Sequence, residues 1–299
     1  MTPSAPAGTD PDWNGIWKMR HAQQESSKTA CDHSHDWNKK ENAERYDANA
    51  QSGYDDRVRT TIAALDVTKN ARVLDIGAGP GTLAIPLAPL VKEITAVEPG
   101  AGMLEILMKH ADTKGIRNIT VVQKRWEDVD LSGDLNIPYD IVIASLSLTM
   151  HDIREALVKM NDAASGSVHL FWFVDMPFWE KMYADLWEPL HGTPYYSGPK
   201  ADCLFGVLYQ MGIYADVQML PLSKEYRFTS REETLSFFVK RFGATIPEQV
   251  RIVEEYLAPL IRHEGDGIVI SGDSTFAHIW WRKEHRVNGG GRGRPGGAL

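Results

Sequence analysis

The feature that most constrains this chain is a glycine-rich turn placed directly after a run of apolar residues. Residues 73–82 read Val-Leu-Asp-Ile-Gly-Ala-Gly-Pro-Gly-Thr. Glycine has no side chain and tolerates positive φ, so the backbone of such a turn can approach a ligand closely. A helix that follows the turn presents unpaired N–H groups and a partial positive charge. The segment therefore predicts a strand, a ligand-binding turn and a helix in succession.

Apolar runs of strand length alternate with helical patterns along the rest of the chain. The predicted strands are 72–77, 93–98, 119–123, 140–148, 167–174, 215–222 and 275–282, and the predicted helices are 81–91, 101–114, 153–163, 177–190, 231–242 and 247–263. Nearly continuous apolar strands are typical of a parallel sheet that is covered on both faces. We expect a three-layer, doubly wound α/β fold with a mostly parallel seven-stranded sheet, helices on both faces and an antiparallel last strand.

Changes in composition divide the chain into four parts. We expect a disordered N-terminus (1–12), an N-terminal helical segment that forms a lid (13–70), the α/β domain (71–285) and a flexible Gly/Arg tail (286–299). Within the domain, the segments 176–212 and 229–272 interrupt the regular alternation. We expect these helical insertions to cover the ligand pocket.

Charge and composition favour a cytoplasmic protein with no nucleic acid or membrane partner. The formal net charge is −8, which disfavours a phosphate backbone as partner. No apolar run approaches the roughly 20 residues that cross a bilayer, and the N-terminus lacks the pattern of a signal peptide. Two cysteines are too few for a disulfide scaffold and suit a reducing compartment.

The spacing of the turn distinguishes between ligands. Dinucleotide folds use G-x-G-x-x-G, whereas this chain has G-x-G-x-G, with an acid, Asp75, two residues before the first glycine. An acid there suits an ammonium group and disfavours a pyrophosphate, which argues against a nicotinamide oxidoreductase. The pattern resembles the first motif of class I S-adenosylmethionine-dependent methyltransferases. The resemblance implies that the amino-acid part of this cofactor is held by Asp75, Gly77, Ala78, Gly79, Gly81 and Thr82.

Further motifs of that family follow in its order. Glu98, at the end of the second predicted strand and before Pro99, resembles the acid that binds both ribose hydroxyls. Met103 resembles the apolar residue that packs on the adenine. The resemblance also implies that Glu127, beside Trp126, accepts a hydrogen bond from the adenine amino group, with Asp128 as the alternative acid.

Two more residues belong to the implied cofactor site. Ser145 lies in the fourth predicted strand, which in the family ends beside the transferable methyl group. Tyr46, upstream of the glycine turn, resembles an aromatic residue that closes over the cofactor. Ordinary helix packing is the alternative for Tyr46.

Histidines and a cysteine supply candidates for catalysis and metal binding. His151 follows the fourth predicted strand and could act as a general base, or it could form a pocket wall while Asp152 caps the next helix. Cys31, His33 and His35 resemble a zinc-ligand cluster, and a polar loop over the active site is the alternative.

The resemblance implies methyl transfer by in-line displacement to a small-molecule acceptor, giving S-adenosylhomocysteine. In the family, the aromatic segment after the fifth strand helps to build the acceptor pocket, and aromatic walls suit an apolar or cationic acceptor. Packing along a helix face is the alternative for most of these aromatic residues. Two other functions stay open: a methyltransferase acting on a protein or tRNA, and a non-catalytic S-adenosylmethionine-binding protein. The sequence leaves the acceptor atom and the oligomeric state undetermined.

Overall fold

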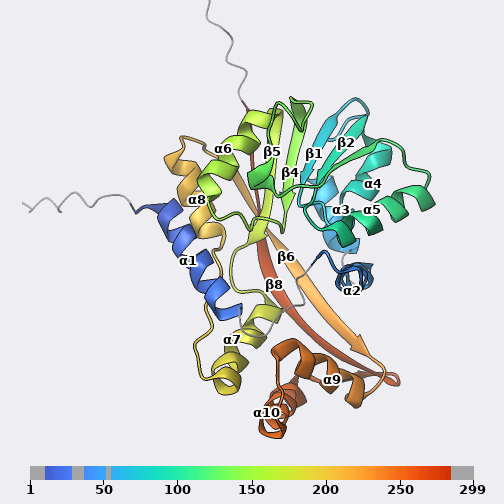
Figure 1. Cartoon of the computed structure of the whole chain (residues 1–299), viewed down its shortest axis with the longest axis vertical. Helices are drawn as coiled ribbons and strands as arrows, with labels where there is room; N and C mark the ends of the chain where they lie inside the picture. The colour runs from blue at the N-terminus through green and yellow to red at the C-terminus, as the bar shows by residue number, and fades with distance from the viewer. Residues whose placement is uncertain (1–10, 29–36, 52–54, 284–299) are drawn as a thin grey trace, which may run out of the picture.

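The structure, a computed structural model, describes residues 11–28, 37–51 and 55–283. It is built around one twisted sheet with helices on both faces (Figure 1). Most of the predicted N-terminal segment 1–12 and the predicted tail 286–299 lie outside the described residues. The same is true of the candidate metal ligands Cys31, His33 and His35.

The sheet follows the doubly wound order β3-β2-β1-β4-β5-β8-β6, with β7 paired to β8. The strands are β1 (Arg72–Ile76), β2 (Glu93–Val97), β3 (Ile119–Val122), β4 (Tyr139–Ser145), β5 (Ala164–Phe173), β6 (Asp216–Phe228), β7 (Arg262–Glu264) and β8 (Gly267–Arg282). Strands β1 to β5 are parallel, and β8 runs antiparallel to β5 and β6. The predicted fold class and the antiparallel last strand are confirmed.

The strand β7 corrects one predicted helix. Residues 262 and 263, expected at the end of a helix over 247–263, instead belong to this eighth strand, Arg262–Glu264. The helix ends early because Pro259 lacks the N–H that a continuing helix needs. Gly265, with φ of 60°, then turns the chain so that His263 pairs with Ile268 of β8.

Helices cover the two faces of the sheet. The described helices are α1 (Trp13–Lys28), α2 (Lys40–Gln51), α3 (Asp55–Ala63), α4 (Ala84–Leu87), α5 (Ala101–Thr113), α6 (Ile153–Ala163), α7 (Phe178–His191), α8 (Ala201–Gln210), α9 (Arg231–Phe242) and α10 (Pro247–Leu257). One core joins α1, α6 and α8 to the sheet, and another joins α4 to the opposite face. None of the described helices combines the length and the apolarity that a bilayer crossing requires.

The helix α8 was not predicted, and the helix after the glycine turn is shorter than predicted. Helix α8 contains Gly206, which lowers helix propensity, but a Cβ at this position would lie 2.1 Å from the ring of Trp13. Gly206 thus lets α1 pack closely on α8. Only Ala84–Leu87 of the predicted helix 81–91 is α-helical, and a 3-10 turn follows over Ala88–Leu90.

The strands β6 and β8 form a long antiparallel arm that extends beyond the rest of the sheet (Figure 1). Pairing runs from Asp216 with Trp280 to Phe228 with Ile268. At the far end of this arm, α7, α9 and α10 pack into a separate apolar core. The two helices expected between the last two strands are therefore present, and they lie against α7.

Candidate functional site

The glycine turn lies at the carboxyl end of β1, where the strand order reverses between β1 and β4. Such a reversal opens a crevice that binds ligands in doubly wound sheets. Gly77 and Gly79 have φ of 72° and 56°, which favours glycine. A Cβ on Gly77 would lie 2.3 Å from the Cβ of Ser147, whereas a Cβ on Gly79 would meet no atom within 4 Å. The turn is thus closed on its protein side and open at Gly79.

The carboxyl group of Asp75 is buried at the base of this turn. Its side chain is 2% exposed, and Oδ2 has no hydrogen-bond partner among the described residues. Burial raises the pKa of Asp75 to about 7, the charge of Glu98 adds to the rise, and that of Arg57 opposes it. A cationic group of a ligand would supply the missing partner and favour the ionised carboxylate.

Glu98 lies next to the end of β2 and is bound across the turn. Its Oε1 accepts from the backbone N–H of Gly100 at 2.8 Å, and its Oε2 accepts from that of Gly79 at 3.1 Å. Burial raises its pKa, and these two backbone N–H groups oppose the rise. The carboxylate is therefore held in a fixed orientation beside Gly79.

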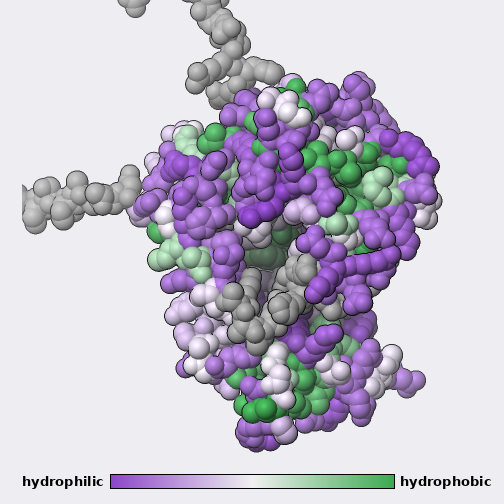
Figure 2. Space-filling view, in the orientation of Figure 1, coloured by the Kyte–Doolittle hydropathy of each residue, from purple (hydrophilic) through white to green (hydrophobic). Residues whose placement is uncertain are grey.

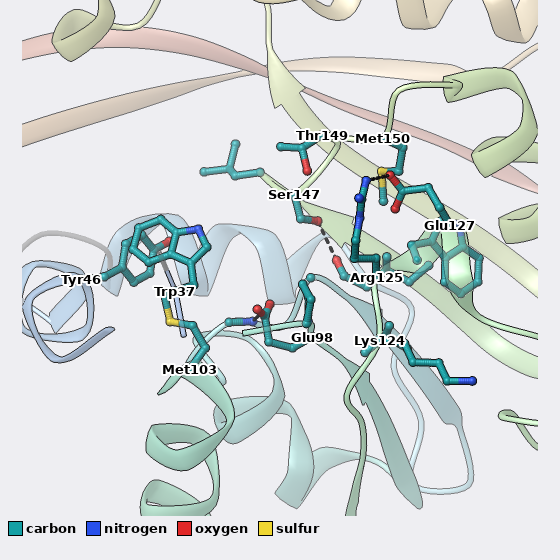
Figure 3. A pocket seen from close by; sticks show the side chains of 17 residues that line it. Trp37, Tyr46, Glu98, Met103, Lys124, Arg125, Glu127, Ser147, Thr149 and Met150 are labelled. Atoms are coloured by element: carbon teal, nitrogen blue, oxygen red, sulfur yellow. Dashed lines mark hydrogen bonds and ion pairs between the residues drawn. The ribbon is translucent and has the colours of Figure 1, made fainter. Parts of the chain in front are cut away.

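The first cavity, of about 240 Å³, contains most of the predicted cofactor residues (Figure 3). Those that line it are Tyr46, Gly77, Gly79, Glu98, Pro99, Met103, Trp126 and Glu127. A smaller adjoining cavity, of about 40 Å³, is lined by Asp75, Ala78, Thr82 and Ser145, together with Tyr46, Gly77 and Gly79. Gly81 lines neither; with φ of 86°, it lets the turn approach Ile85 and Leu107.

Several residues that line the first cavity were not predicted from the sequence, among them Trp37, Arg125, Leu146, Ser147 and Thr149. Trp37 packs edge-on against Tyr46, with ring centroids 5.4 Å apart. Ser147 donates from Oγ to the carbonyl of Ile76 at 2.6 Å, which ties the end of β4 to the end of β1. Arg125 forms an ion pair with Glu127 at 2.8 Å.

Leu146 has φ of 56°, the only positive φ of a non-glycine residue among the described residues. This conformation is uncommon outside glycine and tends to occur at functional sites. The Leu146 backbone N–H donates to the carbonyl of Phe171 at 2.9 Å, and its side chain lines the first cavity and the smaller one. No pattern in the sequence marks this residue.

The structure does not bring His151 into a cavity wall. Its side chain is exposed, whereas Asp152 caps α6 by accepting from the backbone N–H of Glu155 at 3.0 Å. The histidine that lines the second cavity, described below, is His21 of α1, whose ring lies edge-on to that of His151. The place of His21 at this site could not be predicted from the sequence, because α1 reaches the site only through long-range packing.

A second cavity, of about 290 Å³, adjoins the first. Trp37, Leu146 and Thr149 line both cavities. The rest of its wall comes from α1, the end of β5, α7, the segment 195–200 and Arg241 of α9. The space-filling view shows a hollow with apolar atoms at its floor between polar rims (Figure 2). Both predicted pocket-covering segments, 176–212 and 229–272, thus contribute side chains.

Comparisons with known proteins identify the domain that carries the glycine turn. Residues 73–165 match the family model described as a methyltransferase domain. This span includes Asp75, Glu98 and the Trp126–Glu127 turn. This part of the chain is therefore similar to methyltransferase domains, in agreement with the resemblance of its motifs to those of class I S-adenosylmethionine-dependent methyltransferases.

The chain is also similar to other known proteins, and the solved structures among them share its fold. It is 26% identical over 223 residues to an uncharacterised protein of Haemophilus influenzae, covering 74% of this chain and 79% of that protein. A candidate methyltransferase structure from Bacillus halodurans aligns with TM-score 0.52 at 16% identity, over 77% of this chain and all of that one. The plantazolicin methyltransferase BamL aligns with the same TM-score at 12% identity, over 91% and 99% of the two chains.

S-adenosylmethionine is the cofactor of class I methyltransferases, and the residues present fit it. Oδ2 of the buried Asp75 carboxyl has no hydrogen-bond partner among the residues that the structure describes, as a site for the cofactor's ammonium group requires. The described residues contain no group of three or more His, Cys, Asp or Glu side chains that could hold a metal ion.

Proposed function

We propose that this protein binds S-adenosylmethionine in the first cavity and its small extension, and methylates a small molecule in the second cavity. Asp75 would pair with the ammonium group of the cofactor, and Glu98 would accept from the ribose hydroxyls. Met103 and Trp126 would enclose the adenine, with Glu127 facing its amino group. The turn residues Gly77, Ala78, Gly79 and Thr82, with Ser145, would surround the amino-acid part.

One observation carries the proposal of methyl transfer: the two cavities share Trp37, Leu146 and Thr149. An acceptor in the second cavity would therefore meet the cofactor at this shared wall. The cofactor supplies a methyl group already activated on a sulfonium, so the protein has only to align the acceptor and exclude water. The buried aromatic wall of the second cavity suits both tasks.

The same cavity distinguishes this proposal from its two alternatives. A non-catalytic cofactor-binding protein has no need for a second cavity beside the first. A methyltransferase acting on tRNA or protein needs a broad surface, and for RNA a basic one, whereas the chain carries a net charge of −8. A partly enclosed cavity of about 290 Å³ holds a small molecule instead.

Calorimetric titration with S-adenosylmethionine and S-adenosylhomocysteine tests the cofactor site. We expect Asp75→Asn to weaken S-adenosylmethionine binding at least tenfold, because a neutral amide cannot pair with the ammonium group. Glu98→Gln should weaken binding of both compounds by a similar factor. Asp112→Asn is the matched control, since this exposed carboxylate pairs only with the exposed Arg117 among the described residues. Equal affinity in all four proteins, or no binding by the folded native chain, would refute the proposed site.

A further inference from the structure

We propose that the acceptor is a neutral, planar aromatic compound that stacks on the rings of the second cavity. This inference rests on the proposed function, because it names the substrate class of the same site. It narrows the sequence-based expectation of an apolar or cationic acceptor to an aromatic one without charge. It follows from the ring surfaces of the cavity wall, from the hydrogen bonds of its polar atoms and from the partners of its charged side chains.

Three half-buried aromatic side chains form the accessible part of this wall. Phe173 ends β5, Trp179 lies in the first turn of α7, and Tyr195 lies between α7 and α8. The rings of Phe173 and Trp179 pack edge to face, with centroids 5.4 Å apart and planes at 78°. Such packing holds each ring in one orientation. The wall therefore offers ring surfaces that are fixed before a ligand arrives, which lowers the cost of binding a flat molecule.

A layer of buried rings supports Tyr195 from behind. Tyr183 and Trp187, both of α7, are buried. The Tyr195 ring lies nearly parallel to that of Tyr183, with centroids 6.1 Å apart and planes at 16°. It is also packed at 63° against the ring of Trp187, with centroids 5.9 Å apart. A ligand ring that stacks on Tyr195 would extend an arrangement that the protein already uses.

The polar atoms of these rings are not presented to a ligand. The indole N–H of Trp172 and the hydroxyl of Tyr183 both donate to backbone carbonyls, at 2.9 Å and 3.2 Å. The hydroxyl of Tyr195 donates to Glu180 at 3.0 Å. The indole N–H of Trp187 has no hydrogen-bond partner among the described residues, but it is buried. A flat aromatic molecule can therefore stack here without displacing any of these hydrogen bonds.

Glu180, the one carboxylate among the described residues that line this cavity, has little capacity left for a cationic ligand. It is 6% exposed, and its Oε2 accepts from Nζ of Lys200 at 2.8 Å. Its Oε1 accepts from Gln24 at 3.2 Å, from Tyr195 at 3.0 Å and from Ser197 at 3.1 Å. Four donors occupy most of the lone pairs of a carboxylate. The contacts of Glu180 instead join α1, α7 and the segment before α8.

The lysine and the arginine of the wall have partners as well. Lys200 is paired with Glu180. The guanidinium of Arg241 lies over two rings, 5.3 Å from the centroid of Tyr183 and 5.9 Å from that of Tyr226, and aromatic faces attract a cation at such distances. A charged acceptor of either sign would compete with these contacts, whereas a neutral ring leaves them in place. The wall therefore favours a neutral acceptor.

The positions of the rings set the direction in which an acceptor lies. Trp179 and Tyr195 line the second cavity alone, whereas Trp37, Leu146 and Thr149 also line the first. A molecule whose ring stacks on Trp179 and Tyr195 would direct a substituent toward this shared wall, where the cofactor is proposed to lie. Trp179 and Tyr195 are in this sense specificity-determining residues that take no part in the chemical step.

Matched probes test the inference on the full chain saturated with S-adenosylhomocysteine. Calorimetry compares 2-naphthol with its saturated analogue trans-decahydro-2-naphthol, with the anion 2-naphthoate and with the cation 2-naphthylmethylammonium. We expect 2-naphthol to bind at least tenfold more tightly than each of the other three. The saturated alcohol has a similar apolar surface, so the burial of apolar area alone would give the two alcohols similar affinities.

Variants then place the bound ring. Trp179→Leu should reduce the preference for 2-naphthol over its saturated analogue, and Trp179→Leu combined with Tyr195→Leu should abolish it. The matched control is Trp280→Leu, because Trp280 is also half-buried but lines neither the first nor the second cavity. This variant should retain the preference. Binding of S-adenosylhomocysteine, together with circular dichroism, reports whether each variant is folded.

Each contrary outcome is distinct. Equal or tighter binding of the saturated alcohol, the anion or the cation overturns the inference, and this comparison needs no variant. An unchanged preference for 2-naphthol in the folded double variant also overturns it. Failure of 2-naphthol to bind while S-adenosylhomocysteine binds normally refutes the aromatic acceptor and leaves the cofactor site intact. Failure of S-adenosylhomocysteine itself to bind refutes the proposed function.

Discussion

Replacing Asp75 with asparagine should stabilise the cofactor-free protein increasingly as the pH rises. In the folded protein, burial raises the pKa of Asp75 from its ordinary value of 3.8 to about 7. Below pH 3.8 the group is protonated in both the folded and the unfolded chain. As the pH rises toward 7, the unfolded chain gains the favourable ionisation that the folded chain lacks. The free energy of unfolding therefore falls, and asparagine abolishes this loss.

The size of the effect follows from the two pKa values. One pH unit of separation corresponds to about 1.4 kcal/mol, so the full loss above pH 7 is roughly 4 kcal/mol. Because about 1.7 kcal/mol of it has already developed at pH 5, roughly 2.5 kcal/mol should develop between pH 5 and pH 8.5. An asparagine that lacks a hydrogen-bond partner carries its own cost of about 1–3 kcal/mol, but that cost does not vary with pH.

Urea unfolding followed by tryptophan fluorescence measures this difference. The free energy of unfolding of each protein is determined at pH 5.0 and at pH 8.5 without cofactor. The contribution of titrating groups that do not interact with Asp75 is common to both proteins and cancels in the comparison. A difference between the variant and the native protein that is the same at both pH values would refute the reasoning. That result would mean that Asp75 is paired or hydrated in the folded protein.

Three further outcomes are expected. Gly77→Ala should lower the free energy of unfolding by about 2 kcal/mol or more in urea titrations, since its φ is 72° and the new Cβ would lie 2.3 Å from that of Ser147. His21 lines the second cavity, where its imidazole could accept the proton of a hydroxyl acceptor as a general base. His21→Gln should therefore reduce turnover of such an acceptor at least tenfold in a methyl-transfer assay, whereas the exposed His151→Gln should leave turnover unchanged. Equal effects of the two substitutions would exclude this role for His21. Burial lowers the pKa of His278 to about 4, so acidification from pH 6.5 toward 4 should destabilise the native protein. A flatter dependence of unfolding on pH in His278→Phe checks this.

The sequence predicted the fold well because one physical pattern, alternation of apolar strands and amphipathic helices, extends over most of the chain. The bounds of α6 and α9 agree with the prediction. At the start of each helix, the side chain of the preceding residue, Asp152 or Ser230, caps the backbone. Predictions were wrong where one residue opposed the local pattern. Pro259 converts a helix end into a turn before β7. Gly206 lowers the helix propensity of α8, and so hides this helix in the sequence, but it lets α1 pack closely on α8.

Some residues of the candidate site could be predicted from the sequence, and others could not. Asp75 and Glu98 could be expected near each other because each lies in or just after a parallel strand, and the ends of these strands meet at one edge of the sheet. His21 comes from α1, Trp37 from the segment before α2 and Arg241 from α9, so only tertiary packing brings them to the cavities. His151 seemed well placed by its distance from β4, but the direction of its side chain depends on the turn after Leu146, which no pattern encodes.

The long arm of β6 and β8 has an evolutionary consequence. In the sequence, α9 lies between these two strands, and it contributes Arg241 to the wall of the second cavity. The first cavity, in contrast, is lined by none of the described residues after Met150. Substitutions or exchanges within 229–266 can therefore retune acceptor choice while donor binding is preserved. A chimera that carries this stretch from a relative with a different acceptor would inherit the relative's selectivity, while its cofactor site would stay unchanged.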